Sequence, residues 1–244
     1  RKRKRKRKRK RKREEKDQQK ERKKRIIMAT PFQIIYHKTL TFRAAPIQMI
    51  LLHVGQSFEM IEPTWHPDRC LQNNPGYPAF APPVLVEGSF TLGQTNAIVH
   101  YLGRKFHLGF NSNDVQLLAT TQQLVNDVGD LGSELFKIGK DAEEKKKWLS
   151  EGEDSRLHKW LVHLDKAQQI NGKKYFQCDE PTEVDFSAVV AFDCLDYSLG
   201  EGWRELASEG QRNWYKDMTN LPFYEAYTKQ ATAPILFESY KPKE

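Results

Sequence analysis

The sequence lacks a long apolar run. No stretch approaches the roughly 20 apolar residues that a helix needs to cross a bilayer, and no apolar segment of the signal-peptide kind follows the basic N-terminal residues. These absences argue against a protein that crosses a membrane by helices, and we expect no membrane partner.

Cysteine is also scarce. The three cysteines, Cys70, Cys178 and Cys194, lie far apart and form no CxxC pair, so neither a disulfide framework nor a zinc site is indicated. The histidines show no metal-ligand spacing, and we expect no metal. Such a cysteine content suits a reducing compartment, and we predict a cytoplasmic location.

Acidic residues are few in the first 27 residues, where 19 Lys or Arg stand against 4 Asp or Glu. This tail carries about +15 and the remaining chain about −7, so the pI of 9.2 describes the tail. A like-charge run buries no apolar surface, and we predict disorder for residues 1–27. The tail is either an arm that binds polyanions or a simple-sequence extension ahead of a start at Met28. We expect a nucleic-acid partner only if the tail belongs to the native protein.

Residues 33–62 alternate between strand and helix signals. The run QIIY, residues 33–36, suits a buried strand. A helix is predicted from Ala45 and Pro46 to Gly55, because Pro is common at a helix start and Gly just past its end. The run SFEMIE that follows alternates apolar and polar residues, which is typical of a half-buried strand. The order is strand, helix, strand.

A second set of strands follows a segment rich in Pro, Asn and Gly between Pro63 and Pro83. The runs VLV and SFTL, joined at Glu87 and Gly88, predict a tight hairpin. A helix with Ile98 and other apolar residues on one face comes next. Residues 28–108 are therefore expected to form a small α/β domain.

Residues 109–244 show only helical patterns. A long helix is predicted after Ser112 or Asn113, either of which can cap it. A later segment places Leu157, Trp160, Leu161 and Leu164 on one helical face. In the run PTEVDF, Thr182 and Asp185 have the spacing of a capping box ahead of an apolar helix. An all-helical second domain is expected.

The order and spacing of these segments resemble the cytosolic glutathione S-transferases. RAAPIQMILLHVGQSFE and PPVLVEGSFTLGQTNAIVHYLGR are similar to the pi class and its alpha, mu and sigma relatives. LVNDVGDL resembles the first long helix of the family's second domain, and PTEVDF resembles its capping box. The resemblance implies a thioredoxin-like first domain, an all-α second domain and a homodimer.

The polar corner at Gln94 and Thr95 opens the helix that follows the hairpin. The first amides of a helix have no intrahelical acceptor and lie at the positive end of its dipole, so they suit a carboxylate. We predict that Thr95 caps this helix. By resemblance, Gln94 and Thr95 bind the γ-glutamyl carboxylate of glutathione and Arg43 makes the pocket electropositive. Asp130 is similar to an acid that reaches the γ-glutamyl ammonium across the dimer interface.

The rest of glutathione is assigned by resemblance alone. In the family a cis-proline, here Pro83, turns the next strand so that its open edge pairs with the cysteinyl residue, which implies the main chain of Val84. A tryptophan and a basic residue hold the glycyl carboxylate, which implies Trp65 and Arg69.

Thiol chemistry needs a donor to the sulfur. A hydrogen bond that favours the thiolate over the thiol lowers the pKa of glutathione. In the resembling classes that donor is a tyrosine at the end of the first strand, which favours Tyr36. An ungapped alignment places His37 there instead, and one residue changes the face of a strand. Tyr36 as donor, His37 in its place, or an inactive site are the three alternatives.

The resemblance implies a glutathione transferase that joins the thiolate to hydrophobic electrophilic small molecules. Residues around Phe136, Ile138 and the C-terminal ILFESY are expected to select the second substrate. A glutathione-dependent isomerase of the prostaglandin synthase type and a non-catalytic ligand binder or scaffold of the same fold are the alternatives.

Overall fold

The computed structural model describes residues 31–65, 71, 76–109, 113–139, 141–150, 155–231 and 234–236. The basic tail predicted for residues 1–27, Arg69 and Cys70 lie outside these described residues.

The first part of the chain forms a mixed four-stranded sheet with the strand order β2-β1-β3-β4. The strands are β1 (Phe32–Ile35), β2 (Phe58–Ile61), β3 (Val84–Glu87) and β4 (Phe90–Gly93). β1 is parallel to β2 and antiparallel to β3, and β3 is antiparallel to β4. A 3-10 helix, η1 (Phe42–Ala44), leads into α2 (Ala45–His53), and α3 (Thr95–Phe106) follows β4. The predicted order of strands and helices is confirmed.

Local sequence signals explain the ends of these elements. Pro46 lies in the first turn of α2, where N–H groups make no hydrogen bond within the helix, so the missing N–H of proline costs nothing there. Gly55, after α2, and Gly88, in the hairpin turn, have φ values of 70° and 60°, which glycine adopts without a Cβ clash.

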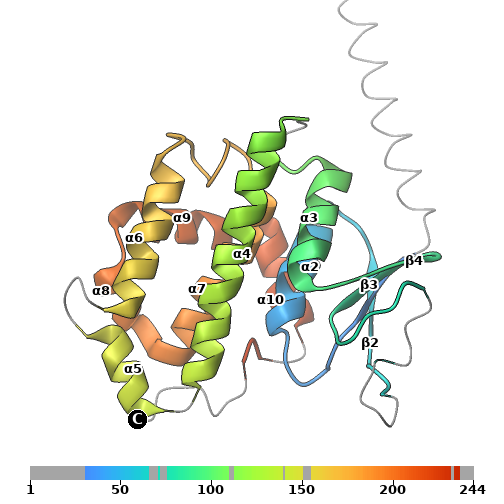
Figure 1. The fold of residues 1–244 in the computed structure, drawn as a ribbon, viewed down its shortest axis with the longest axis horizontal. Coiled ribbons are helices and arrows are strands. Elements are labelled where there is room, and N and C mark those ends of the chain that lie inside the picture. Colours follow the sequence, from blue (N-terminus) through green and yellow to red (C-terminus); the bar gives the residue numbers. More distant parts are fainter. Residues whose placement is uncertain are drawn as a thin grey trace, which may run out of the picture.

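The second part of the chain is helical. Its elements are α4 (Val115–Ile138), α5 (Ala142–Leu149), α6 (Arg156–Gln169), α7 (Glu183–Leu199), η2 (Gly200–Gly202), α8 (Trp203–Leu206), α9 (Glu209–Thr219) and α10 (Pro222–Gln230). Figure 1 shows α2 and α3 lying between the sheet and α4. The predicted architecture, a thioredoxin-like α/β part followed by an all-α part, is confirmed, and the expected boundary after residue 108 falls between α3 and α4.

The cap of α4 differs from the prediction. Asp114, and neither Ser112 nor Asn113, is the N-cap, and its carboxylate accepts hydrogen bonds from the N–H groups of Gln116 and Leu117 at 2.9 and 3.2 Å. Three capping residue types stand in a row there, and the sequence alone does not rank them. The capping box of α7 at Thr182 and Asp185 is confirmed.

The core is continuous across the two parts. β1 alternates, so Phe32, Ile34 and Tyr36 join the large core shared with the helices, whereas Ile35 lies in a smaller cluster on the other face of the sheet. The His53 ring at the end of α2 lies 5.1 Å from the Phe186 ring of α7. Within the described residues, none of the helices is both long enough and apolar enough to cross a membrane.

Candidate functional site

A cavity of about 610 Å³ lies where the sheet-containing part of the chain meets the helical part. Its walls come from η1 and the start of α2, the N-terminus of α3, one face of α4 and the first half of α7. Its polar lining includes Arg43, Gln94, Thr95, Asn96, Asp130 and Ser133. Four predicted site residues, Arg43, Gln94, Thr95 and Asp130, are thus brought to one cavity.

The N-terminus of α3 opens into this cavity without a side-chain cap. Gln94, and not Thr95 as predicted, is the N-cap residue, and its side chain accepts no capping hydrogen bond. Thr95 is the first helical residue, and its hydroxyl donates to the carbonyl oxygen of Arg43 at 3.1 Å. Thr95, Asn96 and Ala97 all line the cavity, and the first N–H groups of a helix have no intrahelical acceptor. The helix therefore presents free donors and a positive dipole end to the cavity.

Gln94 has an unusual backbone conformation, with φ 70° and ψ 115°. Residues other than glycine rarely adopt a positive φ, and those that do are concentrated at functional sites. The conformation sets the sharp corner between β4 and α3. It is a local feature that the sequence pattern did not reveal.

Asp130 and a group of amides face the α3 terminus from α4. Asp130 is exposed and lines the cavity of its own chain, whereas the resemblance implied an acid that reaches the site across a dimer interface. Asn96 Nδ2 donates to Asn126 Oδ1 at 2.9 Å, and Gln122 Nε2 donates to the same oxygen at 3.3 Å. Gly129 leaves room for Asn96, because a Cβ there would lie 3.0 Å from Asn96 Nδ2. Sequence reasoning missed these amides, which carry no motif of their own.

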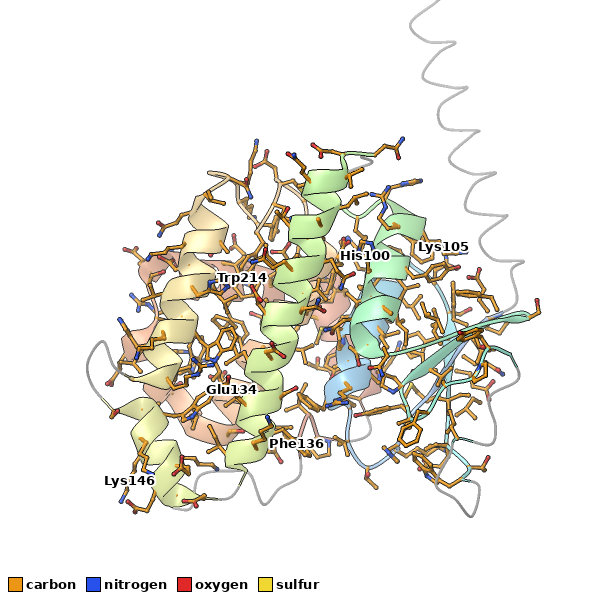
Figure 2. All side chains as sticks on the ribbon, viewed as in Figure 1. His100, Lys105, Glu134, Phe136, Lys146 and Trp214 are labelled. Carbon is orange, nitrogen blue, oxygen red and sulfur yellow. The ribbon has the colours of Figure 1, made fainter. Side chains whose placement is uncertain are left out.

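An apolar wall completes the cavity. The Phe42 ring, which lines it, stacks on the Phe136 ring of α4 with centroids 5.7 Å apart and planes at 8°. Phe136 is 39% exposed and is not itself a lining residue, and Figure 2 shows it near the C-terminal end of α4. Ile138 is half-buried against the core and is not among the lining residues. Of the C-terminal ILFESY, only Ile235 and Leu236 lie within the described residues.

Tyr36 lies beneath the cavity wall and is not part of its lining. Its side chain is 4% exposed, and its hydroxyl accepts a hydrogen bond from the N–H of Arg43 at 3.3 Å. Burial raises the pKa of Tyr36, so the phenol is protonated at neutral pH. Tyr36 lies on the helix-covered face of the sheet with Phe32 and Ile34.

The His37 ring contacts the Tyr36 ring edge to face, with centroids 5.4 Å apart and planes at 61°. The His37 ring is half-exposed and stacks on the Trp65 ring, with centroids 6.0 Å apart and planes at 21°. Trp65 is 42% exposed, and neither ring is among the cavity-lining residues. Arg69 lies outside the described residues.

The Pro82–Pro83 peptide bond is cis, as expected at Pro83. The strand edge expected at Val84 is not open, however. β3 lies between β1 and β4, and Val84 is opposite Ile35 on one side and Gly93 on the other. The edges of the described sheet are β2 and β4, and the chain just before β3 holds Pro82 and Pro83, which have no N–H to donate. The sequence pattern located the proline but not the position of β3 in the sheet.

The arrangement suits a small zwitterion joined to an apolar group. A carboxylate can accept hydrogen bonds from the first turn of α3 beside the Arg43 guanidinium, while Asp130 can bind an ammonium. Phe42 and Phe136 offer apolar surface beside this polar end. Within the described part of the chain, no group of three or more His, Cys, Asp or Glu side chains is placed to hold a metal ion.

Comparison with known proteins agrees with this architecture. No protein-family model matches the sequence, and no curated protein matches it. A structure of the pi-class glutathione S-transferase of Onchocerca volvulus matches with a TM-score of 0.68 at 16% identity, over 87% of this chain and 100% of that chain. A structure of NaGST-2 matches with a TM-score of 0.59 at 17% identity, over 84% of this chain and 99% of that chain. The chain therefore has the fold of the cytosolic glutathione S-transferases.

Proposed function

We propose that the protein is a glutathione transferase, which activates the thiol of glutathione and joins it to hydrophobic electrophiles. The observation that carries this proposal is the uncapped N-terminus of α3, which shares one cavity with Arg43 and Asp130. The likeness in fold to glutathione transferases supports it.

The γ-glutamyl end of glutathione fits the polar end of the cavity. Its carboxylate would accept hydrogen bonds from the first N–H groups of α3, with the Arg43 charge nearby. The Thr95 hydroxyl, which donates to the Arg43 carbonyl oxygen in the structure, would turn to donate to the carboxylate instead. Its ammonium would lie against Asp130. Gln94, exposed at the same corner, would add a side-chain amide.

The cysteinyl and glycyl parts would extend toward the cis bond at Pro83 and toward Trp65. Because Pro82 and Pro83 have no N–H, the chain at the cis bond can only accept hydrogen bonds through its carbonyl groups. Val84, which is fully buried and has strand neighbours on both sides, would act only by fixing the strand that follows the cis bond. Arg69, also proposed for the glycyl carboxylate, lies outside the described residues.

Tyr36 is the proposed donor to the sulfur. The thiol gives its proton to solvent, the Tyr36 hydroxyl donates to the resulting thiolate, and the sulfur forms a bond to an electrophilic carbon as a leaving group departs with the bonding electrons. The raised pKa of Tyr36 keeps the donor protonated. The Tyr36 oxygen accepts a hydrogen bond from the N–H of Arg43, which polarises the hydroxyl further. Because Arg43 lines the cavity, this contact favours Tyr36 over His37.

The second substrate would lie on the apolar wall. Phe42 and Phe136 give a stacked aromatic surface that suits flat apolar electrophiles. A homodimer, implied by the resemblance, and a cytoplasmic location, predicted from the cysteine content, belong to the same proposal.

A non-catalytic ligand binder of the same fold is the second candidate. The Tyr36 hydroxyl favours it, because this group is buried, outside the cavity lining, and engaged with the main chain of Arg43. In this case the cavity would bind glutathione or a similar anion without lowering the pKa of its thiol.

One experiment separates the two functions. The thiolate absorbance of glutathione bound to the full chain is followed against pH for the wild type, Tyr36→Phe and His37→Ala, together with turnover of a chlorinated nitroaromatic. A transferase lowers the pKa of the bound thiol below that of free glutathione, and Tyr36→Phe removes this shift while His37→Ala keeps it. Binding with an unshifted thiol pKa in all three proteins supports the non-catalytic binder, and no binding at all contradicts both.

A further inference from the structure

The corner at residues 41–43 is held by the C-terminal end of the described chain. The N–H of Thr41 donates to the carbonyl oxygen of Pro234 at 3.0 Å, and the N–H of Phe42 donates to that of Ile235 at 3.1 Å. The next residue of this C-terminal segment (residues 234–236), Leu236, is fully buried in the core. Two consecutive peptide groups of the corner thus depend on a segment almost 200 positions away in the sequence.

Helix α10 adds a side-chain contact to the same corner. The hydroxyls of Thr41 and Tyr227 are 2.8 Å apart, and both side chains are buried. One turn earlier on α10, the Tyr224 hydroxyl donates to Asp193 of α7 at 2.9 Å. A single helix therefore hydrogen-bonds to both parts of the molecule through two tyrosines, of which only Tyr227 touches the corner.

The corner transmits its position to the cavity. The carbonyl oxygen of Thr41 accepts hydrogen bonds from the N–H groups of Ala44 and Ala45, so Thr41 begins η1 and α2. The two residues that follow Thr41 are Phe42 and Arg43, which line the cavity on its apolar and its cationic side. A shift of Thr41 would move both side chains with it.

We propose that Tyr227 and the C-terminal segment (residues 234–236) are positioning elements of the site: they hold Thr41 in place and thereby set where Phe42 and Arg43 lie in the cavity. The effect on glutathione rests on the proposed function. The effect on the corner does not, because it follows from hydrogen bonds within the chain.

Tyr227→Phe and Tyr224→Phe form a matched pair for the test. Each removes one hydroxyl from α10 and one hydrogen bond, which is buried for Tyr227 and part-buried for Tyr224, and each loss should lower global stability by the contribution of a single hydrogen bond. Hydrogen exchange of the amides of residues 41–46 is measured in the full chain without any ligand. In Tyr227→Phe we expect these amides to exchange roughly two- to tenfold faster than in Tyr224→Phe, the range that one hydrogen bond allows. Equal exchange in the two variants would overturn the proposal.

Thr41→Val tests the same contact from the other side, and it retains the shape of the side chain. The Thr41 hydroxyl also donates to the Pro234 carbonyl oxygen at 3.5 Å, so Thr41→Val should have the larger effect of the two single variants. Because Thr41 and Tyr227 share one hydrogen bond, adding Tyr227→Phe to Thr41→Val should have little further effect on exchange. Fully additive effects would show that the two hydroxyls act independently and would contradict the proposed role of Tyr227.

Glutathione affinity is the final readout. We expect Tyr227→Phe to weaken binding by roughly two- to tenfold and Tyr224→Phe to leave it unchanged. If the wild type fails to bind glutathione, the proposed function is wrong, while the exchange measurement still decides whether Tyr227 positions the corner. If the wild type binds and both variants bind equally well, the corner does not set the site and the positioning role is wrong.

Discussion

The N-termini of α3 and α7 are built in opposite ways. At α7 the N–H and hydroxyl of Thr182 both donate to Asp185 Oδ2, at 2.9 and 2.8 Å, and Asp185 Oδ1 accepts from Phe176 N–H and the Trp214 indole. That helix start is buried. At α3 no side chain caps the helix, and the first turn lines a cavity. A helix start whose donors are fully used stabilises the fold, whereas one left open beside a cavity is available for a ligand.

The largest predicted effect is a loss of stability when the buried, fully hydrogen-bonded N-terminus of α7, the closed terminus, loses its cap. Asp185→Ala leaves several buried donors without an acceptor and should lower the free energy of unfolding by about 5 kcal/mol. Urea unfolding measures this loss. The matched control is Asp114→Ala at the exposed N-cap of α4, for which we expect about 1 kcal/mol. Equal losses in the two variants would mean that burial of the α7 cap adds nothing.

Another acid of α7 makes stability depend on pH. Burial raises the pKa of Asp193 to about 7, although the Tyr215 and Tyr224 hydroxyls donate to it. In the unfolded chain this carboxyl has a pKa near 3.9, so between pH 3.9 and about 7 the chain binds a proton at Asp193 when it folds. The stability contributed by protonated Asp193 is fully present below about pH 4 and is lost as pH rises to about 7, which lowers the free energy of unfolding by up to roughly 4 kcal/mol.

Asp193→Asn is the control for that prediction. Urea unfolding at intervals between pH 4 and 8 should show a smaller fall in stability for the variant than for the wild type. Parallel curves would show that Asp193 does not take up a proton on folding.

A smaller effect is expected where the C-terminal part of α3 packs against the start of α7. A Cβ at Gly103 would lie 2.5 Å from the carboxyl carbon of Glu183, the first residue of α7, which is 1% exposed. Gly103→Ala should therefore lower the free energy of unfolding by about 2 kcal/mol, although alanine normally favours a helix. In Gly132→Ala the new Cβ meets the Phe42 ring at 3.5 Å, an ordinary contact, and thermal unfolding should show no loss. A stabilised Gly103→Ala would contradict this packing.

The smallest effect on stability is expected at the open terminus. Thr95→Val removes a hydroxyl that donates to the Arg43 carbonyl and should change the unfolding free energy by no more than about 0.5 kcal/mol. Calorimetric titration should nevertheless show glutathione affinity lowered by about tenfold, since the proposed carboxylate loses a donor. Thr120→Val, at an exposed hydroxyl that bonds only within α4, should leave affinity unchanged. Equal glutathione affinities for the two variants would show that the Thr95 hydroxyl does not contact the ligand.

The sequence predicted the fold well because the signals were local. The strand and helix order, the capping box at Thr182 and the cis bond at Pro83 follow from periodicity, spacing and family resemblance. Two details were not predictable. Gln94 replaces Thr95 as N-cap because the chain turns sharply there with a positive φ, which no residue type in the run signals. Val84 is interior because the distant strand β1 pairs with β3 on the side away from β4.

The candidate site was predicted in part for the same reason. Arg43 and Asp130 follow from the resemblance, and the structure brings both to one cavity with Thr95. Asn126 and Phe42 have no motif, and only the packing of α4 against α3 and η1 places them there. The contact of Tyr227 with Thr41 joins positions 186 residues apart, a distance that no local pattern can encode.

The most direct measurement is hydrogen exchange of the first α3 amides, Thr95, Asn96 and Ala97, with and without saturating glutathione. If the open terminus receives the γ-glutamyl carboxylate, these amides exchange more slowly in the complex, while the amides at the closed terminus of α7 do not change. Glutathione that binds without slowing exchange at Thr95, Asn96 and Ala97 would contradict the assignment of the open terminus as its site.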